Sequence, residues 1–197
     1  MSISSEQIDK ILEHIDKNPA VAPENILTLN LTADALQRDF NIAIRPFIDK
    51  APLEDDVRDV MENLFLIREW NVFAAEGGKF FMNLFGDSVA ICGVTAHDDS
   101  RFKLLSCVYV APETTNENTL ASLVLASFVK VLFPTVDAEK FLRGLSGNVT
   151  RDEIKLSLAA DGGLIFVTAV AAGKETVREK ILRGIDNRVN RDEQQSC

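Results

Sequence analysis

The first third of the chain repeats apolar residues at the spacing of amphipathic helices. Three helices are predicted there: one over residues 5–17, one that begins after Thr32 and one that begins after Pro52. Pro46 is expected to end or kink the second helix, because proline lacks an N–H and its ring crowds the preceding turn. The regular secondary structure of the N-terminal third is therefore predicted to be helical.

The first of these helices has clear boundaries. Ser4 and Gln7 have the spacing of a capping box, and Asn18 precedes Pro19, a position that avoids the α region. A short Ala- and Pro-containing linker follows, so residues 1–18 could form an appended arm. We expect a single domain over residues 25–190 and a disordered tail over residues 191–197.

From Trp70 onward, the spacing of apolar residues changes from that of helices to that of strands. Short runs rich in Val, Ile and Phe alternate with Gly- and Asp-containing turn residues. Tight links of this kind leave no room for crossover helices, so the strands are predicted to form an antiparallel meander. The four predicted strands are Trp70–Ala75, Lys79–Phe85, Val89–Thr95 and Phe102–Val110.

The remaining third returns to helices with one hairpin between them. Leu120–Phe133 is apolar nearly all round, as expected of a helix buried on a sheet, and a short helix follows at Asp137–Leu145. A hairpin is predicted between Ile154 and Val170, and an amphipathic helix over Glu175–Val189. The order is three helices, four strands, two helices, two strands and one helix, which indicates an α+β fold: an antiparallel sheet, made of the meander and the hairpin, packed on helices.

Charge restricts the classes of partner. The 197 residues carry a net charge of −9, and residues 1–69 alone hold 14 acidic and 7 basic side chains. Nucleic-acid binding depends on Lys and Arg that neutralise phosphates, so we expect no nucleic-acid partner.

No apolar run reaches the roughly 20 residues of a membrane helix, and no export signal is recognised. A cytoplasmic location is expected.

Candidate chemistry is sparse. Cys92 and Cys107 fall in predicted strands and are expected to be buried thiols, while His14 is expected on the surface and His97 in a turn. A pairing of Cys107 with His97 is conceivable only if strands bring them together. Phosphate-loop and nucleophile-elbow motifs are absent. No cofactor and no metal are expected, and the sequence favours a role other than catalysis.

Acidic residues gather at the start of the third predicted helix, where Asp55, Asp56 and Asp59 follow Glu54. Carboxylates are favourable at the positive end of a helix dipole, so a solvated helix start is a better interpretation than a metal cluster. Glu69 beside Trp70 is the carboxylate in the least ordinary context.

Phenylalanine is abundant, with 12 residues against one Trp and one Tyr. Phe80, Phe81 and Phe85 share one predicted strand, so their rings must point to both of its faces. One face can pack on the helix of residues 120–133. The other needs helices or a partner protein to cover it, and these rings are either core or a binding patch.

The chain from residue 32 onward resembles bacterial type III secretion chaperones in element order and acidity, without a shared motif. The resemblance covers residues 79–110, 120–133, 154–170 and 175–189, and this chain differs by an extra strand, an extra helix and a longer N-terminus. It implies a protein that holds an extended segment of a secreted partner by main-chain hydrogen bonds and apolar pockets. Phe73, Phe81 and Phe85 are the candidate pocket residues, and a homodimer is conceivable.

Two alternatives remain open from the sequence. A toxin-neutralising immunity protein would use its acidity to attract a basic partner, with Asp55, Asp56 and Asp59 as the contact residues. A small-molecule-binding domain or enzyme would use a pocket between the sheet and a helix.

Overall fold

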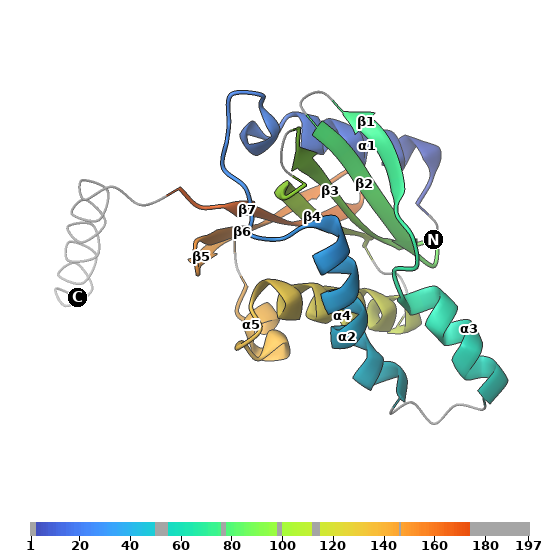
Figure 1. The fold of residues 1–197 in the computed structure, drawn as a ribbon. Coiled ribbons are helices and arrows are strands. Elements are labelled where there is room, and N and C mark those ends of the chain that lie inside the picture. Colours follow the sequence, from blue (N-terminus) through green and yellow to red (C-terminus); the bar gives the residue numbers. More distant parts are fainter. Residues whose placement is uncertain are drawn as a thin grey trace, which may run out of the picture.

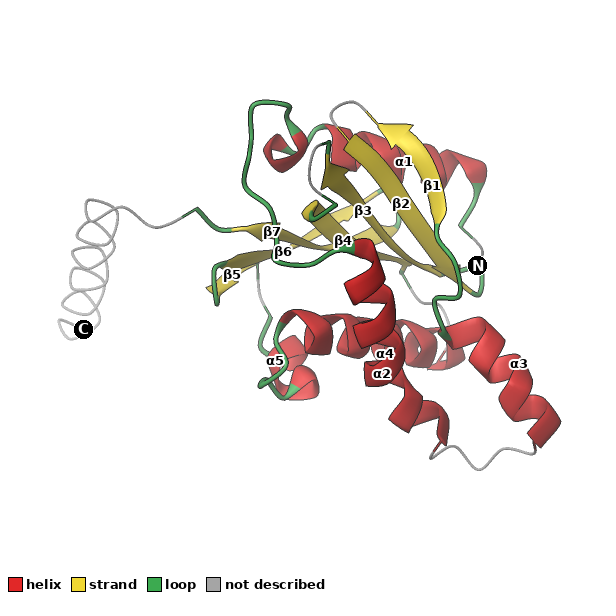
Figure 2. Cartoon of the chain, viewed as in Figure 1, coloured by secondary structure: helices red, strands yellow, loops and turns green. Residues whose placement is uncertain are grey.

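The computed structural model describes residues 3–49, 55–75, 78–97, 100–111, 115–145 and 147–173. The fold is α+β, as predicted, with helices on both faces of one antiparallel sheet (Figures 1 and 2). The predicted helix over residues 175–189 and the predicted tail lie outside the described residues.

The helices lie close to the predicted positions. Their bounds are α1 Ser5–Asp16, η1 Pro19–Val21 (a 3₁₀ turn), α2 Ala33–Asp49, α3 Asp55–Phe65, α4 Thr115–Leu132 and α5 Ala138–Arg143. Of the expectation that Pro46 ends or kinks the second helix, the first part is wrong, because α2 continues through Pro46 to Asp49. The carbonyl that loses its donor belongs to Ile42, an exposed residue, so water can hydrogen-bond it there.

The sheet has seven strands in the order β1-β2-β3-β4-β7-β6-β5, and every pair is antiparallel. The predicted meander and hairpin form one sheet because β4 pairs with β7. The strands are β1 Asn71–Ala75, β2 Gly78–Phe85, β3 Val89–Ala96, β4 Phe102–Val110, β5 Asn148–Arg151, β6 Ile154–Asp161 and β7 Leu164–Ala171.

Strand β5 was not predicted. It joins β6 through a two-residue turn, Asp152-Glu153, in which both residues have positive φ (48° and 63°). Turns of this geometry normally use Asn and Gly. The turn between β6 and β7 has glycine at both positions, Gly162 and Gly163, and both have positive φ.

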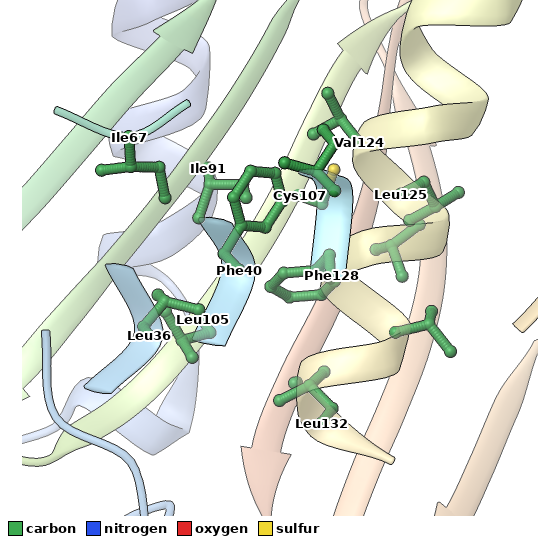
Figure 3. Close-up of a cluster of buried hydrophobic side chains, with 14 of the residues drawn as sticks. Leu36, Phe40, Ile67, Ile91, Leu105, Cys107, Val124, Leu125, Phe128 and Leu132 are labelled. Carbon is green, nitrogen blue, oxygen red and sulfur yellow. The ribbon is translucent and has the colours of Figure 1, made fainter. Parts of the chain in front are cut away.

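Two apolar cores lie on opposite faces of the sheet. The larger one packs α2 and α4 on the sheet, with Phe40 and Phe128 facing Ile91 and Cys107 (Figure 3). All four side chains are fully buried. Because β3 and β4 lie between the two cores, their side chains are buried on both faces.

Helix α1 covers the opposite face of the sheet (Figure 1). Ile11 and Ile15 are buried there against a cluster that includes Leu104 and Phe166. The helix is therefore packed as part of the domain in this structure, whereas the sequence suggested a possible arm.

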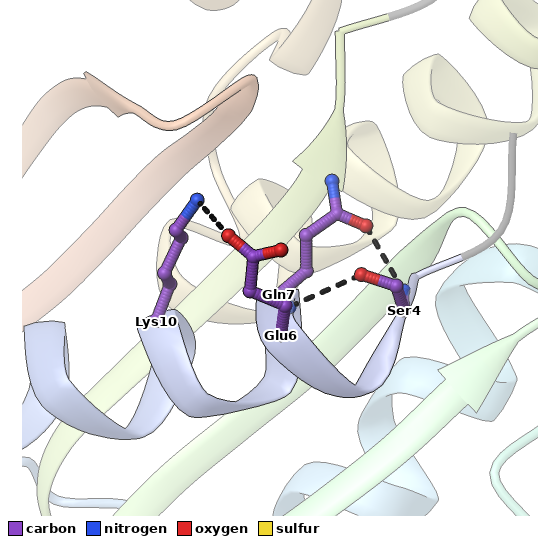
Figure 4. Close-up of polar contacts among 4 residues, drawn as sticks. All are labelled: Ser4, Glu6, Gln7 and Lys10. Atoms are coloured by element: carbon purple, nitrogen blue, oxygen red, sulfur yellow. Dashed lines mark hydrogen bonds and ion pairs between the residues drawn. The ribbon is translucent and has the colours of Figure 1, made fainter.

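The predicted capping box starts α1. The Gln7 N–H donates to Ser4 Oγ at 3.3 Å and the Ser4 N–H donates to Gln7 Oε1 at 2.9 Å (Figure 4). Lys10 pairs with Glu6 one turn away, at 3.0 Å. These contacts fix where α1 begins and hence which of its side chains face the sheet.

Candidate functional site

An apolar groove lies between α1 and the β1–β2 end of the sheet, and we call it the α1–β1 groove. Its volume is about 750 Å³. Its lining comes from α1, from the turn after it and from the two strands: Ile8, Leu12, Asp16, Val21, Ala22, Pro23, Asn71, Phe73, Ala74, Ala75, Phe80, Met82 and Leu84.

The groove exists because α1 divides its apolar residues between two directions. Ile11 and Ile15 are buried over the middle of the sheet. Ile8 and Leu12, one turn apart, line the groove instead and form the wall opposite the strands. The sheet extends beyond the helix on this side, so its last two strands form an apolar floor.

The register of β1 and β2 places the floor residues on one face. Phe73 pairs with Phe80 and Asn71 with Met82, and paired residues of an antiparallel sheet share a face. The rings of Phe73 and Phe80 lie 6.2 Å apart. Phe80 is only 4% exposed, but Phe73 is 57% exposed and Leu84 43% exposed, so the outer part of the floor is an apolar surface open to solvent.

The outer side of β1 is an edge of the sheet. Within the described residues, β1 pairs with β2 alone, and its side chains from Asn71 to Ala74 are exposed. Main-chain groups along such an edge are available to another strand. The site therefore combines an apolar groove with a free strand edge.

Asp16 is the charged residue among those that line the groove. It is the last residue of α1, where the negative end of the helix dipole disfavours a carboxylate. A cation bound at this end of the groove would offset this unfavourable interaction. The groove is thus apolar along its length and negative at one end.

The three predicted pocket residues do not lie together. Phe73 lines the groove, whereas Phe81 and Phe85 face the α2–α4 side of the sheet. Phe81 is half-buried, with its ring edge-on to Trp70 at 6.0 Å and to Phe102 at 5.7 Å. Phe85 is fully buried beside Phe40.

The groove residues that the sequence did not single out are chiefly Leu12, Met82 and Leu84. Alternation along β2 could have separated Phe80 from Phe81, but the pairing of β1 with β2 is needed to place Phe73. Of the predicted acidic contacts, Asp59 is exposed on α3, and the side chains of Asp55 and Asp56 lie outside the described residues.

The thiols are buried, as predicted, and face different cores. Cys92 lies in the core that α1 covers, and Cys107 lies in the larger core that α2 and α4 cover. Burial raises the pKa of Cys92 to about 12 and also raises the pKa of Cys107. Cys107 pairs with Ile91, six positions along β3 and its extension from the exposed His97, which is roughly 20 Å at 3.3 Å per residue. These two residues cannot form a catalytic pair.

His14 is half-buried, whereas a solvated surface position was expected. Its imidazole stacks on the buried ring of Phe166. Glu69, the carboxylate in the least ordinary sequence context, is exposed. In the part of the chain that the structure describes, no group of three or more His, Cys, Asp or Glu side chains could hold a metal ion.

No helix among the described residues is long and apolar enough to cross a membrane. Comparisons with protein-family models, with curated proteins and with solved structures gave no match to this chain. A function must therefore be inferred from the geometry of the groove itself.

Proposed function

We propose that this protein binds another protein by accepting apolar side chains of an extended segment in the α1–β1 groove. The observation that carries the proposal is the exposure of Phe73 and Leu84 in the floor of an apolar groove. Large apolar side chains gathered at one exposed place are typical of an interaction site. The resemblance to secretion chaperones implies the same class of activity.

An extended protein segment suits this site for two reasons. Alternate side chains of a strand point to one face, so every second residue could enter the groove. Asp16 at the end of α1 would attract a Lys or Arg of the same segment. The expected ligand is therefore a segment with alternating apolar residues and a basic residue near one end.

The test uses two leucines of similar exposure. Leu84 lies in the groove, while Leu158, on β6 near the other edge of the sheet, is 40% exposed and serves as the matched control. A photo-crosslinking amino acid placed at position 84 in the native cell should label one apolar segment of one protein. The same group at position 158 should not label that segment.

Purified proteins then decide the assignment. Leu84→Asp should weaken binding of the labelled partner at least tenfold, and Leu158→Asp should leave it within about twofold. Equal effects of the two substitutions, or no discrete segment labelled from position 84, would refute the proposal. Both positions are partly exposed, so the folded state should tolerate both charges.

A second candidate is a small apolar ligand in the same groove. Its volume of about 750 Å³ falls within the range of ligand pockets, roughly 300–1,000 Å³. A thermal shift with fatty acids or sterols that Leu84→Asp abolishes, without any protein labelled from position 84, would favour this candidate.

The toxin-neutralising alternative would use the acidic start of α3, where Asp59 is exposed. A basic partner labelled from position 59, with an association rate that falls as salt rises, would favour it over the groove.

A further inference from the structure

We infer that the outer edge of β1 pairs with β1 of a second copy of this chain, so that two sheets join and two α1–β1 grooves merge. The use of the merged groove rests on the proposed function, but the pairing itself rests on the strand.

The two edges of the sheet are built differently. β5 is four residues long, ends in Arg151 and is followed by the exposed acids Asp152 and Glu153. Charges and short length are the usual means of preventing association at a sheet edge. β1 has the sequence Asn-Val-Phe-Ala-Ala, with no charged residue within the strand, and Glu76 follows it in the chain. The paired part of the β1 edge therefore lacks the charged side chain that Arg151 gives to β5.

β1 is also apolar on both faces. Phe73 shares a face with Phe80 in the groove, and its neighbour Val72, 48% exposed, must point to the opposite face. A strand added to β1 would therefore need apolar side chains on both faces to cover these residues. A second β1 meets that requirement, because it presents the same two side chains.

The main-chain pattern permits the pairing. Ala75 pairs with Gly78 across a two-residue link, and residues that flank such a link form a hydrogen-bonded pair. Alternation then turns the N–H and C=O groups of Val72 and Ala74 to the outer edge. A twofold axis beside Phe73 would place Val72 opposite Ala74 of the second copy, and the two Phe73 side chains opposite each other.

This arrangement has a consequence for the groove. A twofold axis perpendicular to the sheet keeps α1 of both copies on the same face. The two grooves then open toward each other. Both Phe73 rings lie in the shared floor, and one Asp16 lies at each outer end of the merged groove. The dimer would accept a longer segment than one copy can.

The first test is the oligomeric state of the full chain by sedimentation. The wild-type protein should be a dimer, and Ala74→Pro should be a monomer because proline removes an outward N–H without breaking a bond to β2. Thr150→Pro, which removes an outward N–H at the β5 edge by the same alternation from the Arg151–Ile154 pair, should remain a dimer.

The second test does not depend on tolerance of proline. Directly opposite residues of a non-hydrogen-bonded pair have Cβ atoms about 4.5–5.5 Å apart, close enough for a disulfide after small adjustment. In a Cys197→Ser background, Phe73→Cys should form a disulfide-linked dimer on mild oxidation, and Leu84→Cys should not. A monomeric wild-type chain, or a dimer that neither Ala74→Pro nor Phe73→Cys affects, would overturn the inference. Segment labelling from position 84 would still test the proposed function separately.

Discussion

The imidazole of His14 stacks on the ring of Phe166, with 4.0 Å between ring centroids and 21° between ring planes. Burial against the sheet is the larger effect and lowers the pKa of His14, although the nearby Asp161 acts in the opposite direction. Protonation is therefore less favourable in the folded state than in the unfolded chain. His14 contributes stability above the unfolded pKa of about 6.5, and that contribution is lost as pH falls through the folded pKa.

The corresponding prediction concerns stability between pH 7.5 and pH 5. His14→Phe keeps an aromatic ring on Phe166 and removes the titration, so the variant should lose less stability on acidification than the wild-type chain. Urea midpoints at the two pH values measure the difference. Equal losses for the two chains would mean that His14 is not coupled to the packing of α1.

The two strand thiols should not react in the folded protein. Burial raises the pKa of Cys92 to about 12, and its Sγ is also within hydrogen-bonding distance of the Ser106 carbonyl oxygen, at 3.7 Å. Cys107 is equally buried. In a Cys197→Ser chain at pH 8, a thiol reagent such as DTNB should label neither residue until urea unfolds the protein. Labelling at the rate of a free thiol would contradict the burial of these strands.

A buried hydroxyl pair joins β4 to β7. Ser106 Oγ and Thr168 Oγ1 lie 3.0 Å apart and both residues are almost fully buried. Thr168→Val leaves Ser106 without this partner, so we expect a loss of about 1–3 kcal/mol in unfolding free energy. The double variant Ser106→Ala/Thr168→Val should lose less than the sum of the single changes, and strict additivity in denaturant titrations would show that the pair is not coupled.

The two hairpin turns of the C-terminal strands make a matched pair. Glu153 has a φ of 63°, a backbone angle that is unfavourable for residues with a Cβ atom. Glu153→Gly should therefore stabilise the fold by about 1 kcal/mol. Gly163 has φ of 79° with open space around it, so Gly163→Glu should destabilise the fold by a similar amount. Opposite shifts in melting temperature are expected; shifts of the same sign would show that φ does not dominate at these turns.

Most of the fold could be predicted from the sequence because its elements have strong periodicity. The apolar spacing in α1 and α4 and the glycine-bearing turns between strands are local signals. β5 had no such signal, since its turn lacks glycine and Glu153 occupies a conformation that glutamate rarely adopts. Pro46 does not end α2, because the loss of one hydrogen bond on an exposed side does not break a helix held by buried residues such as Ile44 and Ile48.

The groove could not be predicted, because it depends on where α1 lies across the sheet. Ile8 and Leu12 belong to the same sequence stripe as Ile11 and Ile15, yet only the latter pair is fully buried, while Leu12 packs on the margin of that core and also lines the groove. Phe73 was singled out together with Phe81 and Phe85, but the pairing of Phe73 with Phe80 puts it on the other face. Local pattern gives the alternation of side chains and leaves the tertiary arrangement open.

The burial of β3 on both faces has a bearing on how the chain folds. A strand with one solvent-exposed face resists a shift in register, since a shift of one residue would move its apolar side chains into water. From Val89 to Thr95 every side chain is buried, so a shifted β3 would exchange one set of apolar contacts for another. Its alignment must then come from the short turn after Phe85 and from the irregularity between Val94 and Thr95. Errors there would yield compact, misaligned species that retain their strands, and these two places should determine how faithfully the molecule refolds.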